Sequence, residues 1–370
     1  MGQRQRALED LVMSIDPSFW RGRRVFVTGH TGFKGGWLIA MLGSLGAKVY
    51  GYAQAPETDP NLFEAMAIAE TCEHHENDIR DAATLKAAIA AFKPEVVLHL
   101  AAQALVRRSY RAPLANFDTN VMGTANLLDA CRGQSSVKVV VIVTTDKVYE
   151  NKHWNWGYRE SDRLGGADPY SASKAAAEIV VESWRYSFLE AEGIAVATAR
   201  AGNVIGGGDW SEDRIVPDAV RAFAAGKALG VRNPDAIRPW QHVTDSLVGY
   251  LLLAEACWRD STFATAWNFG PDPGQIAPVS RVADLMVSTW GQGSAWENQA
   301  IPGAPKEAAI LLLDSAQART RLNWQPRMTL ETVIAMTIQW YRCFLTDGPG
   351  QRLQALTAAI IADALGTTHH

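Results

Sequence analysis

The 370-residue sequence predicts an α/β fold in which helices cover both faces of a parallel sheet. Apolar, β-branched runs alternate with helical segments, and this alternation is typical of doubly wound sheets. The run 137–144 is almost wholly β-branched, as expected of a central strand that is covered on both faces. An earlier run, 25–28, breaks into glycines before an apolar helix. We therefore expect a strand, a phosphate-binding turn and a helix at the start of the sheet.

The remaining elements follow in chain order from the same patterns. Strands are predicted at 48–52, in a short stretch before 77, and at 93–103, 137–144, 194–200 and 267–270, and helices at 37–45, 113–131, 170–181 and 247–256. After residue 201 the alternation weakens and glycine and proline turns multiply. We therefore assign 20–200 to a domain built on the sheet, to which some later strands return, and 201–350 mainly to a smaller, interleaved domain.

The composition favours a globular protein with small-molecule partners. The chain has 35 basic and 39 acidic residues and no basic block, which argues against a nucleic-acid groove or a membrane-surface patch. Its four cysteines lie far apart without a C-x-x-C pair, so neither a metal site nor a disulfide framework is expected. Residues 1–19 lack the apolar core of a signal peptide and no segment is apolar enough to span a bilayer, which favours the cytoplasm.

The turn after the first strand has glycines spaced three residues apart, G-x-x-G-x-x-G. Gly29 permits a turn that a side chain would obstruct, Gly32 allows the backbone to approach a pyrophosphate, and Gly35 allows the helix to pack on the strand. The N–H groups at the start of the helix would face the anion. We expect a dinucleotide here, and the alternative is a tight turn without a ligand.

Two positions bear on the adenosine half of such a cofactor. Enzymes of this fold usually place an acidic residue after the second strand for the ribose, and here that place holds Tyr52-Ala53-Gln54. Since no arginine stands there to hold a 2′-phosphate, NAD is favoured over NADP. Asp78, after the third strand, could accept the adenine amino group, or it could cap the helix that begins near Ala82.

Polar side chains follow the central strand, where chemistry gathers in open α/β sheets. A hydroxyl, a carboxylate and an amine emerge there at Thr145, Asp146 and Lys147, although a solvated turn with an Asp–Lys ion pair is the alternative. Further along, Tyr170 and Lys174 lie four residues apart and hence on one helix face. We expect the ammonium to lower the pKa of the phenol from about 10, so that Tyr170 can act as a base near neutrality.

These motifs resemble those of the extended short-chain dehydrogenase/reductases, and in particular the nucleotide-sugar 4,6-dehydratases. The glycine turn and the Tyr–Lys pair fit the whole superfamily, whereas Thr145-Asp146-Lys147 and the segment from Arg238 to Val243 indicate the dehydratase branch. The similarity extends over most of residues 20–330 and is strongest to members that act on CDP-glucose. It implies a Rossmann-like NAD-binding domain, a nucleotide-sugar domain, a CDP-glucose substrate and a homodimer built on the Tyr–Lys helices. It also implies a place in deoxysugar biosynthesis, such as that of lipopolysaccharide O-antigen.

The same resemblance implies the residues of the site. The expected catalytic residues are Thr145, Asp146, Lys147, Tyr170 and Lys174. The expected NAD contacts are Gly29, Thr31, Gly32, Phe33, Gly35, Asp78, Ile79, Leu100, Ala101, Ala102, Gln103, Thr119, Thr144, Tyr170 and Lys174. The expected substrate contacts are Asn203, Arg214, Val216 and Arg238. Arg238 would clamp a phosphate, and its alternative is stacking on Trp240. Lys306 stands where family members often carry histidine.

The implied reaction is an internal redox cycle. Tyr170 would deprotonate the glucose 4-hydroxyl while NAD accepts the carbon-4 hydride, with Thr145 hydrogen-bonded to the reacting oxygen. Asp146 would protonate the leaving 6-hydroxyl, and Lys147 would either remove the carbon-5 proton or stay protonated and stabilise the enolate. The alternatives are a nucleotide-sugar 4-epimerase, a dehydratase of another nucleotide sugar and a cofactor-binding regulator without turnover.

Overall fold

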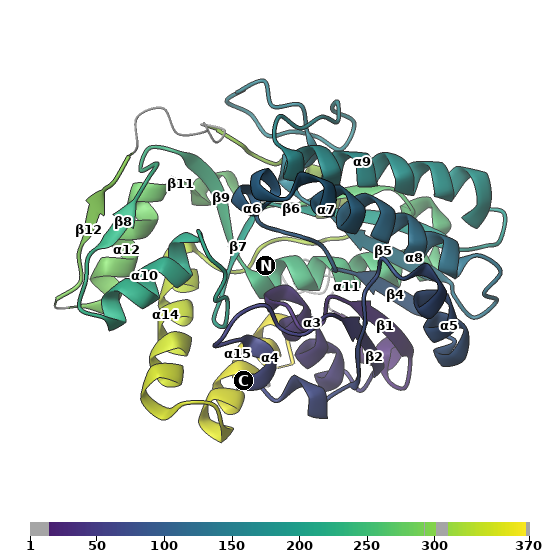
Figure 1. Cartoon of the computed structure of the whole chain (residues 1–370), viewed down its shortest axis with the longest axis horizontal. Helices are drawn as coiled ribbons and strands as arrows, with labels where there is room; N and C mark the ends of the chain where they lie inside the picture. The colour runs from purple at the N-terminus through teal and green to yellow at the C-terminus, as the bar shows by residue number, and fades with distance from the viewer. Residues whose placement is uncertain (1–14, 292, 301–309, 368–370) are drawn as a thin grey trace, which may run out of the picture.

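The computed structural model, which describes residues 15–291, 293–300 and 310–367, is built around a seven-stranded parallel sheet (Figure 1). The strand order is β10–β6–β5–β4–β1–β2–β3. The strands are β1 (Arg24–Thr28), β2 (Lys48–Ala53), β3 (Glu73–Glu76), β4 (Val96–His99), β5 (Val139–Val143), β6 (Ala195–Ala201) and β10 (Ala266–Phe269). Because the chain order reverses between β1 and β4, a topological switch point lies there, where open α/β sheets bind ligands.

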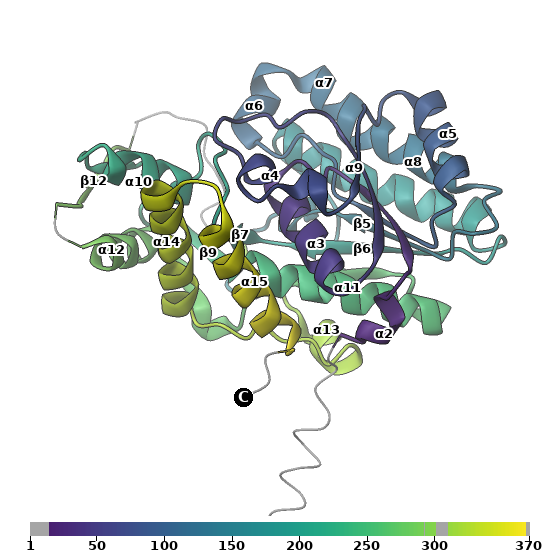
Figure 2. The same ribbon diagram turned by 90° about the horizontal axis from the view of Figure 1, so that it is seen from below.

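Side chains that alternate along the strands pack into two separate layers. Phe26 of β1 and Val97 of β4 belong to a core on one face with α5 (Ala82–Phe92), α8 (Gly123–Cys131) and α9 (Pro169–Trp184). Val27 and Leu98, one residue further along the same strands, belong to a core on the other face with α3 (Phe33–Ser44) and α11 (Val243–Arg259). Figures 1 and 2 show these two helical layers. The doubly wound α/β prediction is confirmed, and β5 is buried along its whole length, as the β-branched run predicts.

Two small sheets lie beside the large one. One has the order β11–β9–β7 and the other pairs β12 with β8. Their strands are β7 (Asn203–Ile205), β8 (Leu229–Val231), β9 (Ile237–His242), β11 (Ile276–Pro278) and β12 (Trp296–Asn298). The helices after residue 201, besides α11, are α10 (Ile215–Ala224), α12 (Val279–Trp290), α13 (Ala316–Arg321), α14 (Leu330–Asp347) and α15 (Gln351–Leu365). Figure 1 shows α10, α12 and α14 beside these sheets, at the end of the molecule away from β1 and β2.

The short helices α2 (Pro17–Trp20), α4 (Leu62–Ala65), α6 (Val106–Arg111) and α7 (Pro113–Phe117) complete the fold. The predicted helix 113–131 is divided, because a π-helical turn, η2 (Asp118–Met122), separates α7 from α8. The helix after the glycine turn begins at Phe33, four residues earlier than predicted. Lys306 and residues 1–14 lie outside the described part of the chain. Within that part, no helix is long and apolar enough to cross a membrane.

Candidate active site

A cavity of about 640 Å³ opens at the carboxyl ends of β1, β4, β5 and β6. Its walls come both from the large sheet and from the segments after residue 201. Every residue expected to contact NAD or substrate lines this cavity, and so do four of the five expected catalytic residues. The exception is Asp146. The fold therefore gathers residues from positions 29 to 238 of the chain around one space.

The three glycines of the turn have different surroundings: two are crowded by protein atoms, and one is open to the cavity. Gly29 has φ of +74°, and a Cβ there would lie 2.6 Å from the backbone nitrogen of Ala101. A Cβ at Gly35 would lie 2.1 Å from the Gly29 carbonyl oxygen, so the helix packs directly on the strand end. At Gly32, which lines the cavity, the nearest protein atom would be 3.5 Å away. The protein thus needs glycine at Gly29 and Gly35 for its own packing, whereas the space at Gly32 is open to a pyrophosphate.

Asp78, the residue expected to accept the adenine amino group, lines the cavity. One carboxylate oxygen of Asp78 accepts a hydrogen bond from Gln54 Nε2 at 2.8 Å, and its other oxygen accepts one from Arg80 Nε at 3.0 Å. The Arg80 guanidinium holds the pKa of this carboxyl below its usual range. Asp81, not Asp78, caps α5 by accepting a hydrogen bond from the Thr84 backbone N–H. The helix-cap interpretation of Asp78 is therefore wrong: Asp78 lines the cavity, and Gln54 and Arg80 hold its carboxylate.

A buried amide network fixes the wall between β4 and α9. Asn120, in the π-helical turn, accepts a hydrogen bond from the Gln103 backbone N–H at 2.8 Å and donates one to Ser173 Oγ at 2.9 Å. Asn116 donates to the Pro169 carbonyl oxygen, also at 2.9 Å. These bonds tie the loop after β4 to the first turn of α9, and they thereby position Tyr170 at the cavity.

Tyr170 and Lys174 line the cavity together, but the expected effect on the phenol is absent. Burial raises the pKa of Tyr170 to about 12, although a hydrogen bond with Thr145 and the charge of Arg214 act in the opposite direction. The Lys174 ammonium donates to the Val143 carbonyl oxygen at 3.2 Å. Burial and the nearby charge of Lys34 lower the pKa of Lys174 to about 8. The prediction of a lowered phenol pKa is therefore wrong for this structure, because desolvation of the phenol outweighs the hydrogen bond with Thr145 and the charge of Arg214.

The Asp146 carboxylate lies behind the cavity wall. Asp146 is 1% exposed, and its Oδ1 accepts hydrogen bonds from Thr145 Oγ1 at 2.9 Å and from Lys147 Nζ at 3.2 Å. Its Oδ2 is buried without a hydrogen-bond partner among the described residues. Thr145 and Lys147 themselves line the cavity. The Asp–Lys ion pair considered from the sequence is thus present, but Asp146 is buried rather than solvated, and it contacts the two residues that face the cavity.

Lys34 is a cavity residue that sequence reasoning missed. Its ammonium donates to the Tyr250 hydroxyl at 3.0 Å. Burial and the charge of Arg214 lower the pKa of Lys34 to about 7, while Asp146 opposes this shift. The only signal in the sequence is a lysine within the glycine turn, directly before Gly35. The turn motif leaves that position unspecified, so the motif gives no reason to select it.

Guanidinium groups line the substrate side of the cavity. Asn203 lies on β7 and Arg238 on β9, while Arg214 directly precedes α10, in which Val216 lies. Arg214 Nη1 lies 3.8 Å from Asp209 Oδ2. The arginines of the lining that come from these and neighbouring segments and from α6 are Arg107, Arg108, Arg214, Arg232 and Arg238. Their planar, permanently charged forks match the oxygens of phosphate groups.

A doubly wound sheet with a glycine turn and a Tyr–Lys pair in one cavity is the architecture of a short-chain dehydrogenase/reductase. The model of the family described as GDP-mannose 4,6 dehydratase matches residues 26–270, and the chain belongs to this family.

Three known proteins illustrate the likeness. The chain is 43% identical to the CDP-glucose 4,6-dehydratase of Salmonella typhimurium over 96% of its own length and 99% of that protein. It resembles the crystal structure of DesIV, a dTDP-glucose 4,6-dehydratase from Streptomyces venezuelae with NAD and TYD bound. In that comparison the TM-score is 0.74 and the identity 23%, with 89% and 99% of the two chains covered. A UDP-glucose-4-epimerase from Stenotrophomonas maltophila has a TM-score of 0.76 at 22% identity, with 88% and 99% covered. The two structures show a shared fold.

Proposed function

We propose that the protein is an NAD-dependent lyase that converts CDP-D-glucose to CDP-4-keto-6-deoxy-D-glucose and water. The observation that carries the proposal is the 43% identity, along 96% of the chain, to a CDP-glucose 4,6-dehydratase. The cavity supports it, since one space combines a glycine turn suited to a pyrophosphate, a Tyr–Lys pair and a set of guanidinium groups. Bound NAD supplies a reversible hydride acceptor, which takes hydride from carbon 4 and returns it to carbon 6.

The cofactor would lie along the strand ends of β1 and β4. Gly32 leaves space for the pyrophosphate, and Asp78 together with Gln54 would meet the adenosine half. Leu100, Ala101 and Thr144, which follow β4 and β5 and line the cavity, would form the walls toward the nicotinamide half.

Oxidation at carbon 4 would depend on Tyr170. Its phenol takes the proton of the 4-hydroxyl as the carbon–hydrogen bond breaks, and Thr145 holds the reacting oxygen by a hydrogen bond. Because burial raises the pKa of Tyr170, positive charge must favour the phenolate. Arg214 already acts in this direction, and Lys174 on the next helical turn supplies a second cation.

Elimination would depend on Asp146 and Lys147. The carbon-5 proton passes to the Lys147 amine, the carbon 6–oxygen bond breaks, and the proton of the Asp146 carboxyl joins the departing hydroxyl to form water. Lys147 reaches the cavity while its ammonium contacts the Asp146 carboxylate, so it is placed to stabilise the enolate. Before this step the proton shared by the pair would lie on Asp146, which would deliver it to the leaving hydroxyl through Thr145, and the ion pair would form again when Lys147 takes the carbon-5 proton.

A homodimer is the second part of the proposal. Large apolar side chains are exposed on α7, the π-helical turn and α9, and Leu114 is 85% exposed. The others are Phe117 on α7, Met122 in the π-helical turn, Ile179 on α9 and Tyr186 just after the end of α9. Exposed apolar patches of this kind mark interaction surfaces. Light scattering at assay concentration should give twice the monomer mass, and a monomer mass alone would contradict the dimer.

The reaction is tested with the purified protein, NAD and three substrates: CDP-glucose, dTDP-glucose and UDP-glucose. We expect the absorbance of a 4-keto-6-deoxy sugar in alkali to develop with the highest kcat/KM for CDP-glucose. An equal or higher value with another nucleotide would refute the substrate assignment. Formation of UDP-galactose from UDP-glucose without a keto product would instead indicate an epimerase.

A further inference from the structure

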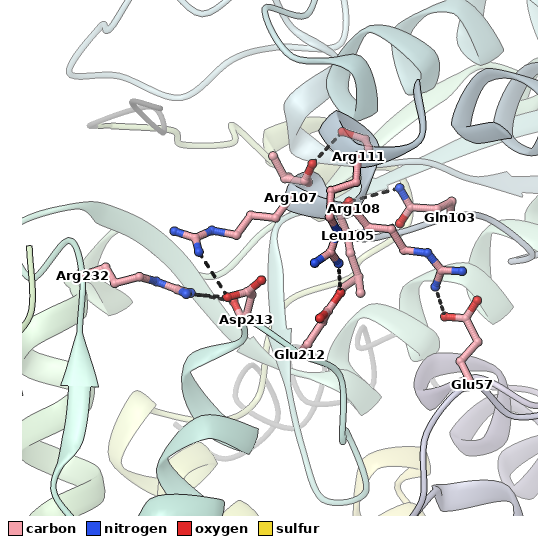
Figure 3. A network of polar contacts seen from close by, with 11 residues as sticks. Glu57, Gln103, Leu105, Arg107, Arg108, Arg111, Glu212, Asp213 and Arg232 are labelled. Carbon is pink, nitrogen blue, oxygen red and sulfur yellow. Dashed lines mark hydrogen bonds and ion pairs between the residues drawn. The ribbon is translucent and has the colours of Figure 1, made fainter. Parts of the chain in front are cut away.

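Ion pairs connect α6 to two segments on the opposite side of the cavity (Figure 3). The pairs are Arg107 with Asp213, Arg108 with Glu57 and Arg111 with Glu212. Glu57 follows β2, while Glu212 and Asp213 precede α10, so each pair joins parts of the chain that are distant in sequence. All of these residues except Arg111 line the cavity.

Asp213 differs from the other two carboxylates because two arginines share it. Arg107 Nη1 lies 3.4 Å from Asp213 Oδ1, and Arg232 Nη1 contacts the same oxygen. Arg232 Nη2 also donates to the Asp213 backbone carbonyl oxygen at 3.3 Å. In Figure 3 dashed lines run from both guanidinium groups to the Asp213 carboxylate. One carboxylate oxygen of Asp213 is thus shared by two guanidinium groups that line the cavity.

The backbone conformation of Asp213 also helps to set the position of its carboxylate. Its φ is +61°, in the left-handed region that few residues other than glycine adopt. Aspartate and asparagine enter this region more readily than most residues, so the sequence tolerates the conformation here. The turn directs the carboxylate toward arginines that come from α6 and from the end of β8.

We propose that Asp213 is an internal competitor for the diphosphate of the nucleotide sugar, occupying Arg107 and Arg232 until the substrate takes them. The proposal rests on the proposed function, because it requires a nucleoside diphosphate group in this cavity. A guanidinium fork binds carboxylate and phosphate with the same geometry, so the two anions exclude one another from one fork. When the diphosphate leaves with the product, Asp213 pairs again with both arginines and assists release.

This competition predicts that substitution of Asp213 increases the affinity for CDP, whereas substitution of an ordinary binding residue would decrease it. Asp213→Asn keeps the shape of the side chain and tolerates the left-handed backbone, but it removes the competing charge. Partly exposed ion pairs contribute little each, so we expect CDP to bind about three- to tenfold more tightly to the variant. The gain should shrink as salt is added, since salt screens the contacts.

Glu212→Gln is the matched control. It removes the same charge from the adjacent residue, but its partner, Arg111, does not line the cavity. Isothermal titration of each folded, full-length variant with CDP and with cytidine separates the two effects. We expect Glu212→Gln to change CDP affinity by less than about twofold. Cytidine, which has no phosphate, should bind Asp213→Asn and the unchanged protein equally.

Unchanged or weaker CDP binding by Asp213→Asn would overturn the proposal, and would mean that Asp213 positions the arginines for the substrate. Equal tightening of CDP binding by Glu212→Gln would also overturn the proposal. Loss of any negative charge near the cavity would then explain the tighter binding through the electrostatic potential alone. Repeating the titration with UDP, dTDP and GDP separates this proposal from the proposed function. If another diphosphate binds best and tightens with Asp213→Asn, the CDP-glucose assignment fails while the competition stands.

Discussion

The glycine turn offers a test in which protein stability and cofactor affinity respond differently to two similar substitutions. Gly32→Ala and Gly35→Ala each add one methyl group within the same turn. At Gly35 the new Cβ would lie 2.1 Å from the Gly29 carbonyl oxygen and 2.6 Å from the His30 Cα. At Gly32 the nearest protein atom would be 3.5 Å away, and the backbone has an ordinary φ of −79°.

These distances set the expected magnitudes. A carbon–oxygen contact needs about 3.3 Å, so Gly35→Ala must move strand and helix apart by about 1 Å, at a cost of about 3 kcal/mol or more. Gly32→Ala reduces the entropy of the unfolded chain but weakens a helix cap, and these effects nearly cancel, to within about 1 kcal/mol. Its methyl group would occupy the pyrophosphate position, and the loss of one charge-assisted hydrogen bond there weakens NAD binding about 10- to 100-fold.

Urea unfolding measures the first quantity, and titration of NAD into each folded variant measures the second. We expect Gly32→Ala to unfold like the unchanged protein but to bind NAD weakly, and Gly35→Ala to lose stability. Wild-type NAD affinity in folded Gly32→Ala would refute the assignment of this turn to the pyrophosphate. Wild-type stability of Gly35→Ala would show that the close approach of helix and strand is not required.

Two further predictions concern proton transfer. Tyr170→Phe should block reduction of bound NAD by the substrate and lower kcat by about 10²- to 10⁴-fold, because the base of the first step is lost. Lys147→Met should still show the absorbance of the reduced dinucleotide but release little keto product; wild-type turnover with normal solvent deuterium at carbon 5 would make Lys147 a structural partner of Asp146. Burial lowers the pKa values of His30 to about 4, His99 to about 3 and His242 to about 4. The unfolded chain binds a proton at each of these histidines as the pH falls through about 6.5, whereas the native state does not. Each histidine should therefore remove about 2 kcal/mol of stability between about pH 7.5 and 5. An NMR titration in which one of these imidazoles of the folded protein has a pKa near about 6.5 would contradict this.

Local patterns were enough to predict the sheet, the glycine turn and the Tyr–Lys pair, whereas the family resemblance supplied most of the other residues expected at the cavity. The β-branched run at β5 predicts a buried strand because a strand covered on both faces has no polar side to display. Three-residue spacing of glycines predicts the turn because close contacts at Gly29 and Gly35 forbid a side chain. The contact at Gly35 lies within one strand–helix unit, whereas Gly29 meets the backbone of Ala101, which follows β4. The spacing of Tyr170 and Lys174 likewise fixes their common helix face, since helical geometry is local.

The tertiary structure decided the properties that depend on neighbours distant in sequence. The pKa of Tyr170 rises because the fold removes water around the phenol, which the four-residue spacing to Lys174 does not reveal. Asp146 adjoins Thr145 in sequence, yet packing places its carboxylate behind the wall that Thr145 lines. Arg107 and Arg232 meet at Asp213 only because α6 and β8 face the same cavity. Hydrophobic periodicity determines which elements form, whereas burial and charge at the site arise from how those elements pack together.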